Sequence, residues 1–395
     1  MKKFAFLRTN DLTKAYTDSY YTEKGVDSYM LSYLPHFFMA SATPQGFFSL
    51  FDNLYYPKDE WFCYILKGGP GTGKSTIMKK IAENAQKLGI DTELIHCSSD
   101  PDSLDAVIFP KLKKCVADGT APHILDPIYP GISDKIINLG NCWNEKKLQK
   151  NKLKLIDLFE KNKNFHKTAS LFLRKIEDIQ KSKNNLIEQY IDTKKLEKSF
   201  EKIFKSTFKD VTTTKTTKSH ENLRFLDATT PIGHRFFSET VSSYAENIYI
   251  IEDRYDLVAN KILQKLRKKI IEKNIEIISC PHALDPKNRL RAILIPSIKT
   301  AFVAKNPKTE KFLSIEEKNH KKISTAKFWD LTALKLHKNI INFYDKIIFE
   351  FYEEAVANLD KALKTHQEIE KAYSLAMNYQ KTEKIADKLI SAIVK

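Results

Sequence analysis

Residues 64–89 read YILKGGPGTGKSTIMKKIAENAQKLG, and this stretch decides the fold. Within it, residues 68–75, called the glycine loop below, match the pattern G-x-x-x-x-G-K-S/T at every position. The apolar run at 61–66 before the loop is typical of a buried strand, and the residues after it place Ile77 and Ile81 on one helical face. A strand, a glycine-rich loop and a helix in this order predict an α/β fold.

The glycine loop has the composition of a phosphate-binding site. Glycines let successive backbone N–H groups turn toward one anion, and the N-terminal dipole of the following helix adds to the attraction. Lys74 is placed to reach the β- and γ-phosphates, and the Ser75 hydroxyl to ligate Mg²⁺. The sequence therefore predicts ATP and Mg²⁺ as cofactors. The predicted nucleotide-binding residues are Gly68, Gly69, Pro70, Gly71, Thr72, Gly73, Lys74, Ser75 and Thr76.

A Mg²⁺ ion at such a loop needs a second protein anchor, usually an Asp that closes a neighbouring strand. Asp118 fits best, because it ends the short apolar run at 114–118. The predicted metal ligands are therefore Ser75 and Asp118, and the predicted catalytic residues are Lys74 and Asp118. The alternatives to Asp118, all in one loop after the strand predicted at 92–97, are Asp100, Asp102 and Asp105.

The residue that activates water is missing from its usual place. Many energy-coupling ATPases have a Glu directly after the metal-binding Asp, but here Gly119 follows Asp118. His123 and Asp105 are the candidate substitutes, although an isolated His is more often structural. The catalytic base stays open at this point.

The chain repeats itself, which predicts an internal duplication. TPQGFFS at 43–49 resembles TPIGHRFFS at 230–238, and LDAVIFP at 104–110 resembles LRAILIP at 290–296. From Leu104 onward the spacing of matched residues stays at 186 for more than a hundred positions. Each half is therefore predicted to be a P-loop NTPase-like parallel sheet with flanking helices, followed by a long helical, coiled-coil-like tail.

The helical tails are predicted from apolar residues that recur at intervals of three and four, the pattern of a paired-helix seam. Phe165, Ala169, Phe172 and Ile176 form one such series, and a second begins at Ile340. The tails either pair with one another or act as a lid or arm that moves with nucleotide. The predicted organisation is an N-terminal extension (1–35), a P-loop domain (36–143), a helical tail (144–206), a linker (207–222), a degenerate P-loop-like domain (223–328) and a C-terminal helical tail (329–395).

The second half has lost the phosphate-binding residues. It reads EDRYDLVANK at 252–261, so that Lys74 falls opposite Ala259 or Asn260. Three acids there also repel phosphate, namely Glu252, Asp253 and Asp256. We expect this half to bind no nucleotide and to serve as a structural partner of the first, because each half offers only about four strands. Either Arg289 or Arg291 reaches the first half's nucleotide, as an arginine finger does, or both are simply solvated.

The net charge and the cysteine content limit which partners and which cellular compartment are expected. The segment 145–219 supplies +10 of the net charge of +16, which is either a footprint for nucleic acid or a protein partner, or a solvated lysine-rich surface. Only eight of the 65 basic residues are Arg, which favours the solvated surface. The five cysteines form no C-x-x-C pair, and neither a signal peptide nor an apolar run of membrane-spanning length is seen. A cytoplasmic protein without membrane contact is expected.

Four stretches carry a resemblance to a known family that covers nearly the whole chain, and they read HFFMASATPQGFFSLFD, ILKGGPGTGKSTIMKKIA, HCSSDPDSLDAVIFPKL and DGTAPHILDPIYPG. The chain resembles a bacterial family of tandem P-loop ATP-binding proteins found in Bacillus- and Clostridium-like organisms. The resemblance implies ATP binding and a P-loop NTPase fold, but it names no substrate. Relatives can carry a glycine-rich loop in both halves, and the degenerate second loop departs from that.

Three classes of function fit these observations. The first is an ATPase or ATP-driven switch whose helical tails respond to nucleotide. The second is a nucleotide or small-molecule kinase with residues 119–131 as the wall of an acceptor pocket, although no set of lid arginines is apparent. The third is an ATP-dependent nucleic-acid-binding protein that uses the basic segment 145–219. The first is the preferred interpretation.

Overall fold

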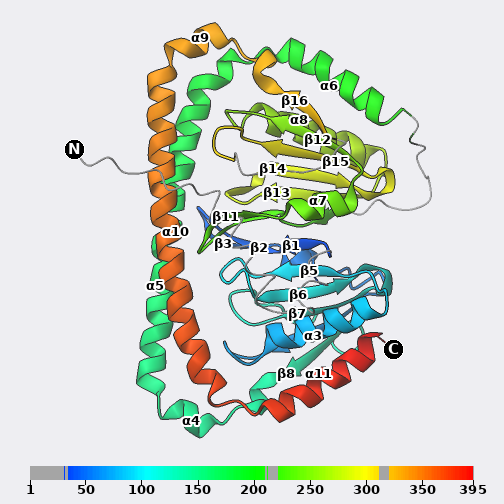
Figure 1. Ribbon diagram of the computed structural model, residues 1–395, viewed down its shortest axis with the longest axis vertical. Coiled ribbons are helices and arrows are strands. Elements are labelled where there is room, and N and C mark those ends of the chain that lie inside the picture. Colours follow the sequence, from blue (N-terminus) through cyan, green and yellow to red (C-terminus); the bar gives the residue numbers. More distant parts are fainter. Residues whose placement is uncertain (1–30, 32–33, 210, 212–220, 311–319, 395) are drawn as a thin grey trace.

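The computed structural model describes residues 31, 34–209, 211, 221–310 and 320–394. Almost all of the extension predicted at 1–35 and most of the linker predicted at 207–222 lie outside these residues. The described chain forms two sheet-plus-helix halves, one above the other, with two long helices along one side of both (Figure 1). No helix in the described ranges has the length and apolar character needed to cross a membrane.

The first half is built on a mixed sheet of six strands in the order β1-β5-β6-β7-β4-β8. Strand β4 lies between β7 and β8 and is parallel to both, whereas β6 is antiparallel to both of its neighbours. The predicted α/β class is present, but the sheet is mixed rather than parallel throughout and has six strands rather than about four. The strands are β1 (His36–Phe38), β4 (Phe62–Lys67), β5 (Glu93–His96), β6 (Leu104–Phe109), β7 (Lys114–Asp118) and β8 (Asp134–Asn138).

The error has a physical cause in the connections of β6. Only residues 97–103 join β5 to β6, and only residues 110–113 join β6 to β7. A parallel neighbour needs a crossover of a dozen or more residues, so connections this short enforce antiparallel hairpins. A true crossover is made by helix α3 (Lys74–Lys87), which connects β4 to β5 and buries Ile77 and Ile81 as the spacing predicted.

The second half has the same strand order and the same relative directions. Its sheet runs β9-β13-β14-β15-β12-β16, with β14 antiparallel to its neighbours and β12 parallel to β15 and β16. Helix α8 (Val258–Glu272) follows β12 as α3 follows β4. The strands are β9 (Glu221–Leu223), β12 (Asn247–Glu252), β13 (Ile277–His282), β14 (Asp285–Ile295), β15 (Thr300–Lys305) and β16 (His320–Ser324).

The two halves meet through a reciprocal backbone contact. The Phe38 N–H donates to the Phe225 carbonyl at 2.8 Å, and the Phe225 N–H donates back to the Phe38 carbonyl at 2.9 Å. Each residue lies five positions before the Thr-Pro of its repeated stretch, so equivalent positions contact one another, as in a two-fold interface. Apolar residues of both halves continue this contact into one shared core.

Two small hairpins and a short helix complete the junction between the halves. The Thr229 N–H donates to the Ser41 hydroxyl at 3.4 Å, which ties one hairpin to the other. These elements are β2 (Ala40–Thr43), β3 (Gly46–Ser49), β10 (Asp227–Thr230), β11 (Gly233–Phe236) and α7 (Ser238–Tyr244).

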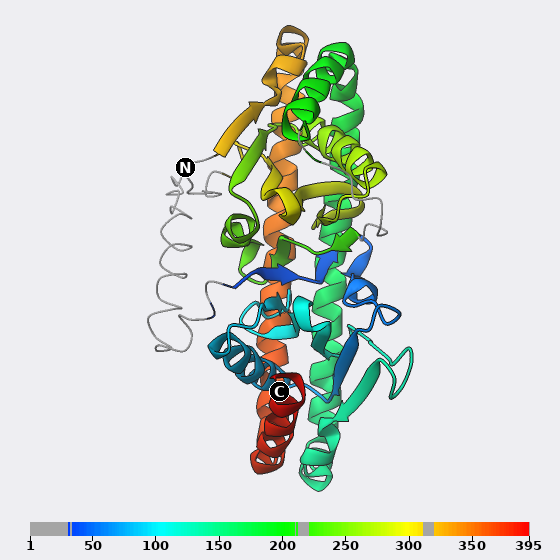
Figure 2. The same cartoon turned by 90° about the vertical axis from the view of Figure 1, so that its right-hand side faces the viewer.

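The two long helices are α5 (Lys152–Ile187) and α10 (Lys338–Ser374), and they lie side by side in opposite directions (Figures 1 and 2). At about 1.5 Å per residue, the 36 residues of α5 span roughly 54 Å, enough to pass both sheets. Phe172 packs against Phe351 with ring centroids 6.0 Å apart, and the buried Lys183 pairs with Asp345 at 3.1 Å. The expected pairing of the helical tails is present.

Each tail ends on the other half of the molecule, which the sequence did not predict. After α5, helix α6 (Thr193–Thr207) packs Phe200 and Phe204 into the apolar cluster of the second half around α8. After α10, helix α11 (Tyr379–Val394) packs into the cluster of the first half around α3. The halves therefore exchange their terminal helices (Figure 1). Two short helices turn the chain at the ends of the long ones, α4 (Glu145–Gln149) and α9 (Leu331–Leu336).

Replacing Leu389 by Ala tests this exchange. Leu389 on α11 is 3% exposed in the cluster around α3, so the cavity is expected to lower the free energy of unfolding by about 2–4 kcal/mol. Leu336→Ala is the matched control, because Leu336 is 84% exposed and its loss should change stability by no more than about 0.5 kcal/mol. Urea unfolding followed by circular dichroism measures both, and equal effects would contradict the docking of α11.

Candidate nucleotide-binding site

The glycine loop leaves the carboxyl end of β4 and leads directly into α3. Gly71 has a φ of +66° and Gly73 a φ of +87°, values that glycine adopts without steric cost. The first backbone bond of the helix runs from the Ile77 N–H to the Gly73 carbonyl at 2.9 Å. The N–H groups before Ile77 therefore have no acceptor within the helix, which is the arrangement that holds an anion.

Lys74 folds back over the loop that precedes it. Its Nζ donates to the carbonyls of Gly68 and Gly69, each at 2.8 Å. The Thr72 hydroxyl donates to the same Gly69 carbonyl at 2.8 Å, which closes the loop around the lysine. The Lys74 side chain is 11% exposed, so its charge sits in a mostly enclosed position.

Asp118 is the carboxylate beside this lysine. Strands β4 and β7 are parallel neighbours in which Leu66 lies opposite Asp118, so the acid and the loop emerge at the same edge. The Asp118 Oδ2 lies 3.5 Å from the Lys74 Nζ. Burial raises the pKa of Asp118, the Lys74 charge opposes that rise, and the nearby Asp105 carboxylate adds to it.

Thr120 links Asp118 to the glycine loop, a connection that the sequence did not indicate. Its N–H donates to the Asp118 Oδ1 at 2.8 Å, and its hydroxyl donates to the Gly68 carbonyl at 2.8 Å. Asp118 is thus held in place from two sides, by Thr120 and by Lys74.

The hydroxyl residues predicted at the loop lie in the first turn of α3. The Ser75 Oγ accepts the Leu104 N–H at 2.9 Å, which ties the helix to the start of β6 and leaves a lone pair and a proton on the hydroxyl. Thr76 is exposed, whereas Thr72 is buried. Ser75 and Asp118 belong to different elements, the first turn of α3 and the end of β7.

Two of the three alternative acids, Asp100 and Asp105, pair through their carboxylates with other side chains, whereas the contact of Asp102 is made by its backbone. The Asp100 carboxylate accepts the Ser103 hydroxyl at 2.6 Å, and the backbone carbonyl of Asp102 accepts the Lys79 Nζ at 2.6 Å. The Asp105 Oδ2 lies 3.0 Å from the His123 Nε2. Among the described residues, Asp118 is the acid that forms an ion pair with Lys74.

His123 and Asp105 form a buried charged pair. Both side chains are less than 10% exposed. Burial disfavours the charged imidazole, but the Asp105 carboxylate, with Asp118 behind it, outweighs this effect and raises the pKa of His123 above its usual range. The His123 imidazole and the Asp105 carboxylate are thus each other's partners inside the first half.

Cys97 lies against the same pair, and its Sγ, an Asp105 oxygen and a His123 nitrogen are all within 4.8 Å of one another. Burial raises the pKa of the Cys97 thiol, and the carboxylates of Asp105 and Asp100 raise it further. The spacing of 186 places Arg291 opposite Asp105, and Arg291 pairs with Glu310 at 2.9 Å. The second half thus has an ion pair of reversed polarity, which favours a structural charge pair over a metal centre.

Neither predicted arginine points to the glycine loop. Arg289 donates to the Asp256 carbonyl at 3.1 Å within its own half. Arg291 is 2% exposed, between Asp227 at 3.3 Å and Glu310 at 2.9 Å. The arginine-finger interpretation is therefore wrong, and so is the solvated alternative for Arg291, because a buried guanidinium needs carboxylate partners.

The loop of the second half is filled by its own carboxylate. The Asp253 Oδ2 accepts the Ala259 N–H at 2.8 Å, in the first turn of α8. The Asp253 Oδ1 accepts the Tyr255 N–H at 3.2 Å and the Thr325 hydroxyl at 3.1 Å. Ala259 is one of the two positions aligned with Lys74, so a side chain of the protein occupies the place where the first half leaves its donors open.

Helix α10 covers the outer side of the glycine loop, which no local pattern in the sequence indicates. A Cβ on Gly71 would lie 2.3 Å from the Glu370 backbone carbonyl oxygen, and a Cβ on Gly69 would lie 2.8 Å from the Tyr373 ring. The His366 Nε2 lies 3.6 Å from a Glu370 carboxylate oxygen. Two loop glycines are therefore required by the approach of a helix that is almost 300 residues away in the chain.

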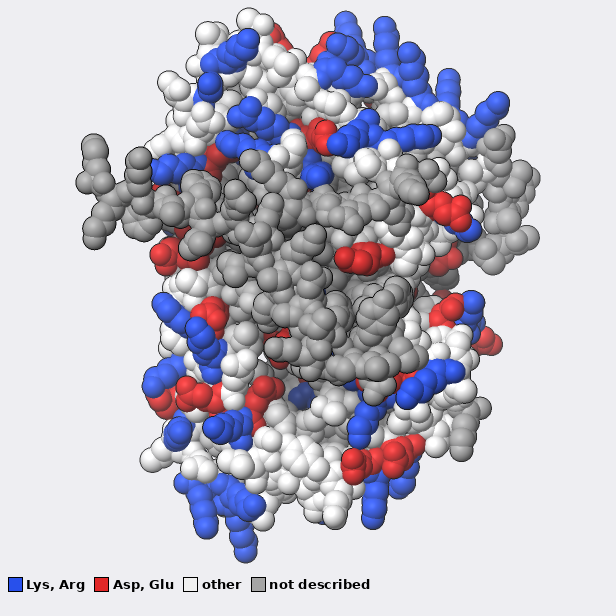
Figure 3. All heavy atoms as spheres, in the orientation of Figure 1, with Lys and Arg blue, Asp and Glu red and all other residues white. Residues whose placement is uncertain are grey.

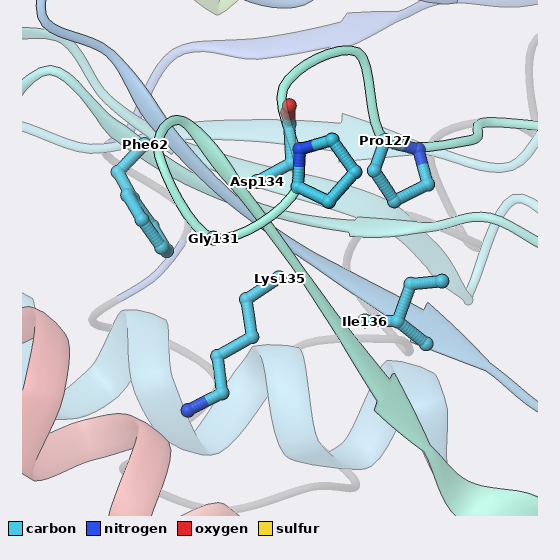
Figure 4. A pocket seen from close by; sticks show the side chains of 7 residues that line it. Phe62, Pro127, Gly131, Asp134, Lys135 and Ile136 are labelled. Carbon is cyan, nitrogen blue, oxygen red and sulfur yellow. The ribbon is translucent and has the colours of Figure 1, made fainter.

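A shallow hollow elsewhere on the first half lies at the opposite edge of the sheet (Figure 4). Phe62, at the start of β4, and Gly131 form part of its wall, whereas the glycine loop follows the end of β4. Its acid, Asp134, already accepts the Tyr55 hydroxyl and the N–H groups of Ile128 and Tyr129. The acid of the hollow is therefore already bonded within the fold.

No protein-family model, curated protein or solved structure matches this chain. The candidate site is therefore defined by its residues and their geometry alone.

The His123–Asp105 pair predicts a pH-dependent stability. Because the folded pKa of His123 lies above the unfolded value of about 6.5, the pair stabilises the fold fully below that pH and the effect is lost as pH rises through the folded pKa. His123→Gln should therefore lower the thermal midpoint most at pH 6 and progressively less toward pH 9. Thermal melts of both proteins across this range measure the difference. A difference that stays constant with pH would mean that folding does not shift the pKa of His123, which would contradict the charged pair.

Proposed function

We propose that this chain binds Mg-ATP at the glycine loop of its first half and works as an Mg²⁺-dependent ATPase that switches the arrangement of its helical tails. The observation that carries the proposal is the combination of an open helix N-terminus, an enclosed Lys74 and an Asp118 3.5 Å from that lysine. These groups come from two adjacent parallel strands and meet at one edge of the sheet. This is where open α/β sheets bind ligands.

Each residue then has a definite task. The N–H groups of the loop and of the first turn of α3 would hold the phosphates, and Lys74 would exchange two carbonyl partners for β- and γ-phosphate oxygens. The Ser75 hydroxyl and the Asp118 carboxylate are oxygen ligands of the kind that Mg²⁺ prefers. When bound, the metal would neutralise charge on the transferring phosphoryl group. Thr120 positions Asp118 for this role.

The second half would contribute structure rather than a second nucleotide. The common strand order of the halves and the reciprocal contact between Phe38 and Phe225 support an ancient duplication. Asp253 occupies the donors at the N-terminus of α8, and its buried charge opposes a phosphate there. We therefore expect one ATP per chain.

The contact of α10 with the glycine loop favours a switch over a kinase. A helix that begins beside the second half and ends on the loop can transmit the state of the nucleotide site. The kinase alternative needs an acceptor pocket near the phosphates. Residues 119–131 do border a hollow, but its wall at Phe62 lies at the far edge of the sheet from the loop.

The basic segment 145–219 is best explained as solvated surface. Three of its acids, Glu188, Glu197 and Glu201, face inward and pair with lysines of α8, which leaves the outer side of α6 rich in lysine. On the face that Figure 3 shows, Lys and Arg side chains gather toward both ends, with acidic side chains between them rather than one continuous basic track. This distribution does not favour nucleic acid as the main partner.

Replacing Lys74 by Ala tests the nucleotide site. Loss of the enclosed ammonium should weaken Mg-ATP binding about 100-fold, since charged hydrogen bonds to phosphate would be lost. Lys87→Ala is the control, because Lys87 is an exposed lysine at the other end of α3 and its loss removes the same charge. Isothermal titration calorimetry with a non-hydrolysable ATP analogue measures both. Unchanged affinity in Lys74→Ala would contradict the proposal.

Replacing Asp118 by Asn tests the metal anchor. The change removes one negative charge and little volume, so it should reduce Mg²⁺-dependent ATP turnover at least about tenfold and raise the Mg²⁺ concentration needed for half-maximal rate. Phosphate release at varied Mg²⁺ provides the measurement. Asp100→Asn is the comparison, and the assignment fails if that variant carries the effect instead.

A further inference from the structure

We propose that Glu370 of helix α10 is a built-in competitor for the nucleotide's phosphates, so that ATP can bind only when the Glu370 carboxylate leaves the glycine loop. The inference rests on the proposed ATP site and adds its regulation. It makes α10, which belongs to the tail of the second half, a part of the nucleotide site of the first.

Helix α10 and the glycine loop are packed closely together. The 2.3 Å between a Cβ on Gly71 and the Glu370 carbonyl oxygen leaves no room for a side chain, and the 2.8 Å at Gly69 places the Tyr373 ring against the next part of the loop. Tyr373 is itself fixed by Trp143, with ring centroids 5.7 Å apart. The last turns of α10 therefore rest on the backbone of the loop itself.

The Glu370 carboxylate is a charged neighbour of the glycine loop. The protonatable His366, at 3.6 Å, is the largest cause that holds the pKa of Glu370 below its usual range, and the Gly71 N–H and the Lys74 charge add to the effect. Glu370 is therefore an anion that accepts a hydrogen bond from a loop N–H and is attracted by the charge of the loop lysine. These are the same two kinds of donor that an incoming phosphate needs.

The corresponding loop of the second half is also contacted by a carboxylate. There, the Asp253 carboxylate accepts an N–H from the first turn of α8 and is 1% exposed. In the first half the carboxylate comes from another helix, and the Glu370 side chain is 35% exposed. A buried carboxylate within the loop blocks the second site permanently, whereas one at the end of a separate helix can be displaced.

Displacement of Glu370 has a consequence for the whole tail. Helix α10 is continuous from Lys338 to Ser374, and near its start Asp345 pairs with the buried Lys183 of α5. By thermodynamic reciprocity, a nucleotide that weakens the contact between α10 and the loop is itself bound less tightly while that contact persists. The state of the ATP site and the position of the tail are thereby coupled.

The experiment compares Glu370→Ala with Glu368→Ala in the full-length chain. Both variants remove one carboxylate from the same part of α10, but Glu368 is exposed and contacts neither loop glycine. Glu370→Ala should bind Mg-ATP about fivefold to tenfold more tightly than the native protein, and Glu368→Ala should bind it equally well. The gain should shrink as salt rises from 50 mM to 500 mM, because two anions compete for one cationic site. Titration calorimetry and phosphate release provide affinity and turnover for each protein.

The outcomes separate the two claims. Equal affinity in Glu370→Ala and the native protein overturns the competitor role while leaving ATP binding intact. Lost turnover at unchanged affinity also overturns it, because Glu370 would then act on the reaction. Absence of Mg-ATP binding in all three proteins contradicts the proposed function itself. Glu370→Gln keeps the size of the side chain and loses its charge, so an increased affinity in that variant supports the competitor role even if alanine disturbs the fold.

Discussion

The reciprocal hydrogen bonds between Phe38 and Phe225 set the geometry on which the rest of the molecule depends. They join the two halves at equivalent positions and merge their apolar residues into one core. Because the halves are fixed in this way, a helix that leaves one of them can run along both, and α5 and α10 do so in opposite directions. The approach of α10 to the glycine loop follows from this arrangement, since its final turns must lie beside the first half.

Local sequence was sufficient to predict the glycine loop, the helix after it and the position of Asp118 beside Lys74, because all three depend on neighbours in the chain or on one pair of parallel strands. Local sequence was not sufficient to predict the direction of β6. Its apolar residues suit a parallel or an antiparallel strand, and the short connections to β5 and β7 decide between them. The contacts of Glu370 and Tyr373 with the loop had no signal at all, since they join segments almost 300 residues apart. Gly69 and Gly71 belong to the loop motif, but they are also needed because α10 packs against them.

Each half buries an ion pair, and the two halves use different residues for it. Asp105 on β6 pairs with His123 in one half, and Arg291 at the related position of β14 pairs with Glu310 in the other. A buried charge requires a partner of opposite sign, but the packing does not specify which strand supplies the cation. The loops after β4 and β12 diverge more sharply, because the Asp253 carboxylate satisfies the donors at the start of α8 and removes the need for any ligand.

The exchange of terminal helices also affects how the chain is made. Helix α3 emerges from the ribosome about 290 residues before α11, the helix that covers its apolar side. At a synthesis rate of about 5–20 residues per second, this delay is on the order of 15–60 s. During that interval the cluster around Met78 and Ile81 lacks its cover, so the first half cannot complete its core as it is translated. The half that carries the glycine loop therefore reaches its final form only after the second half has been synthesised.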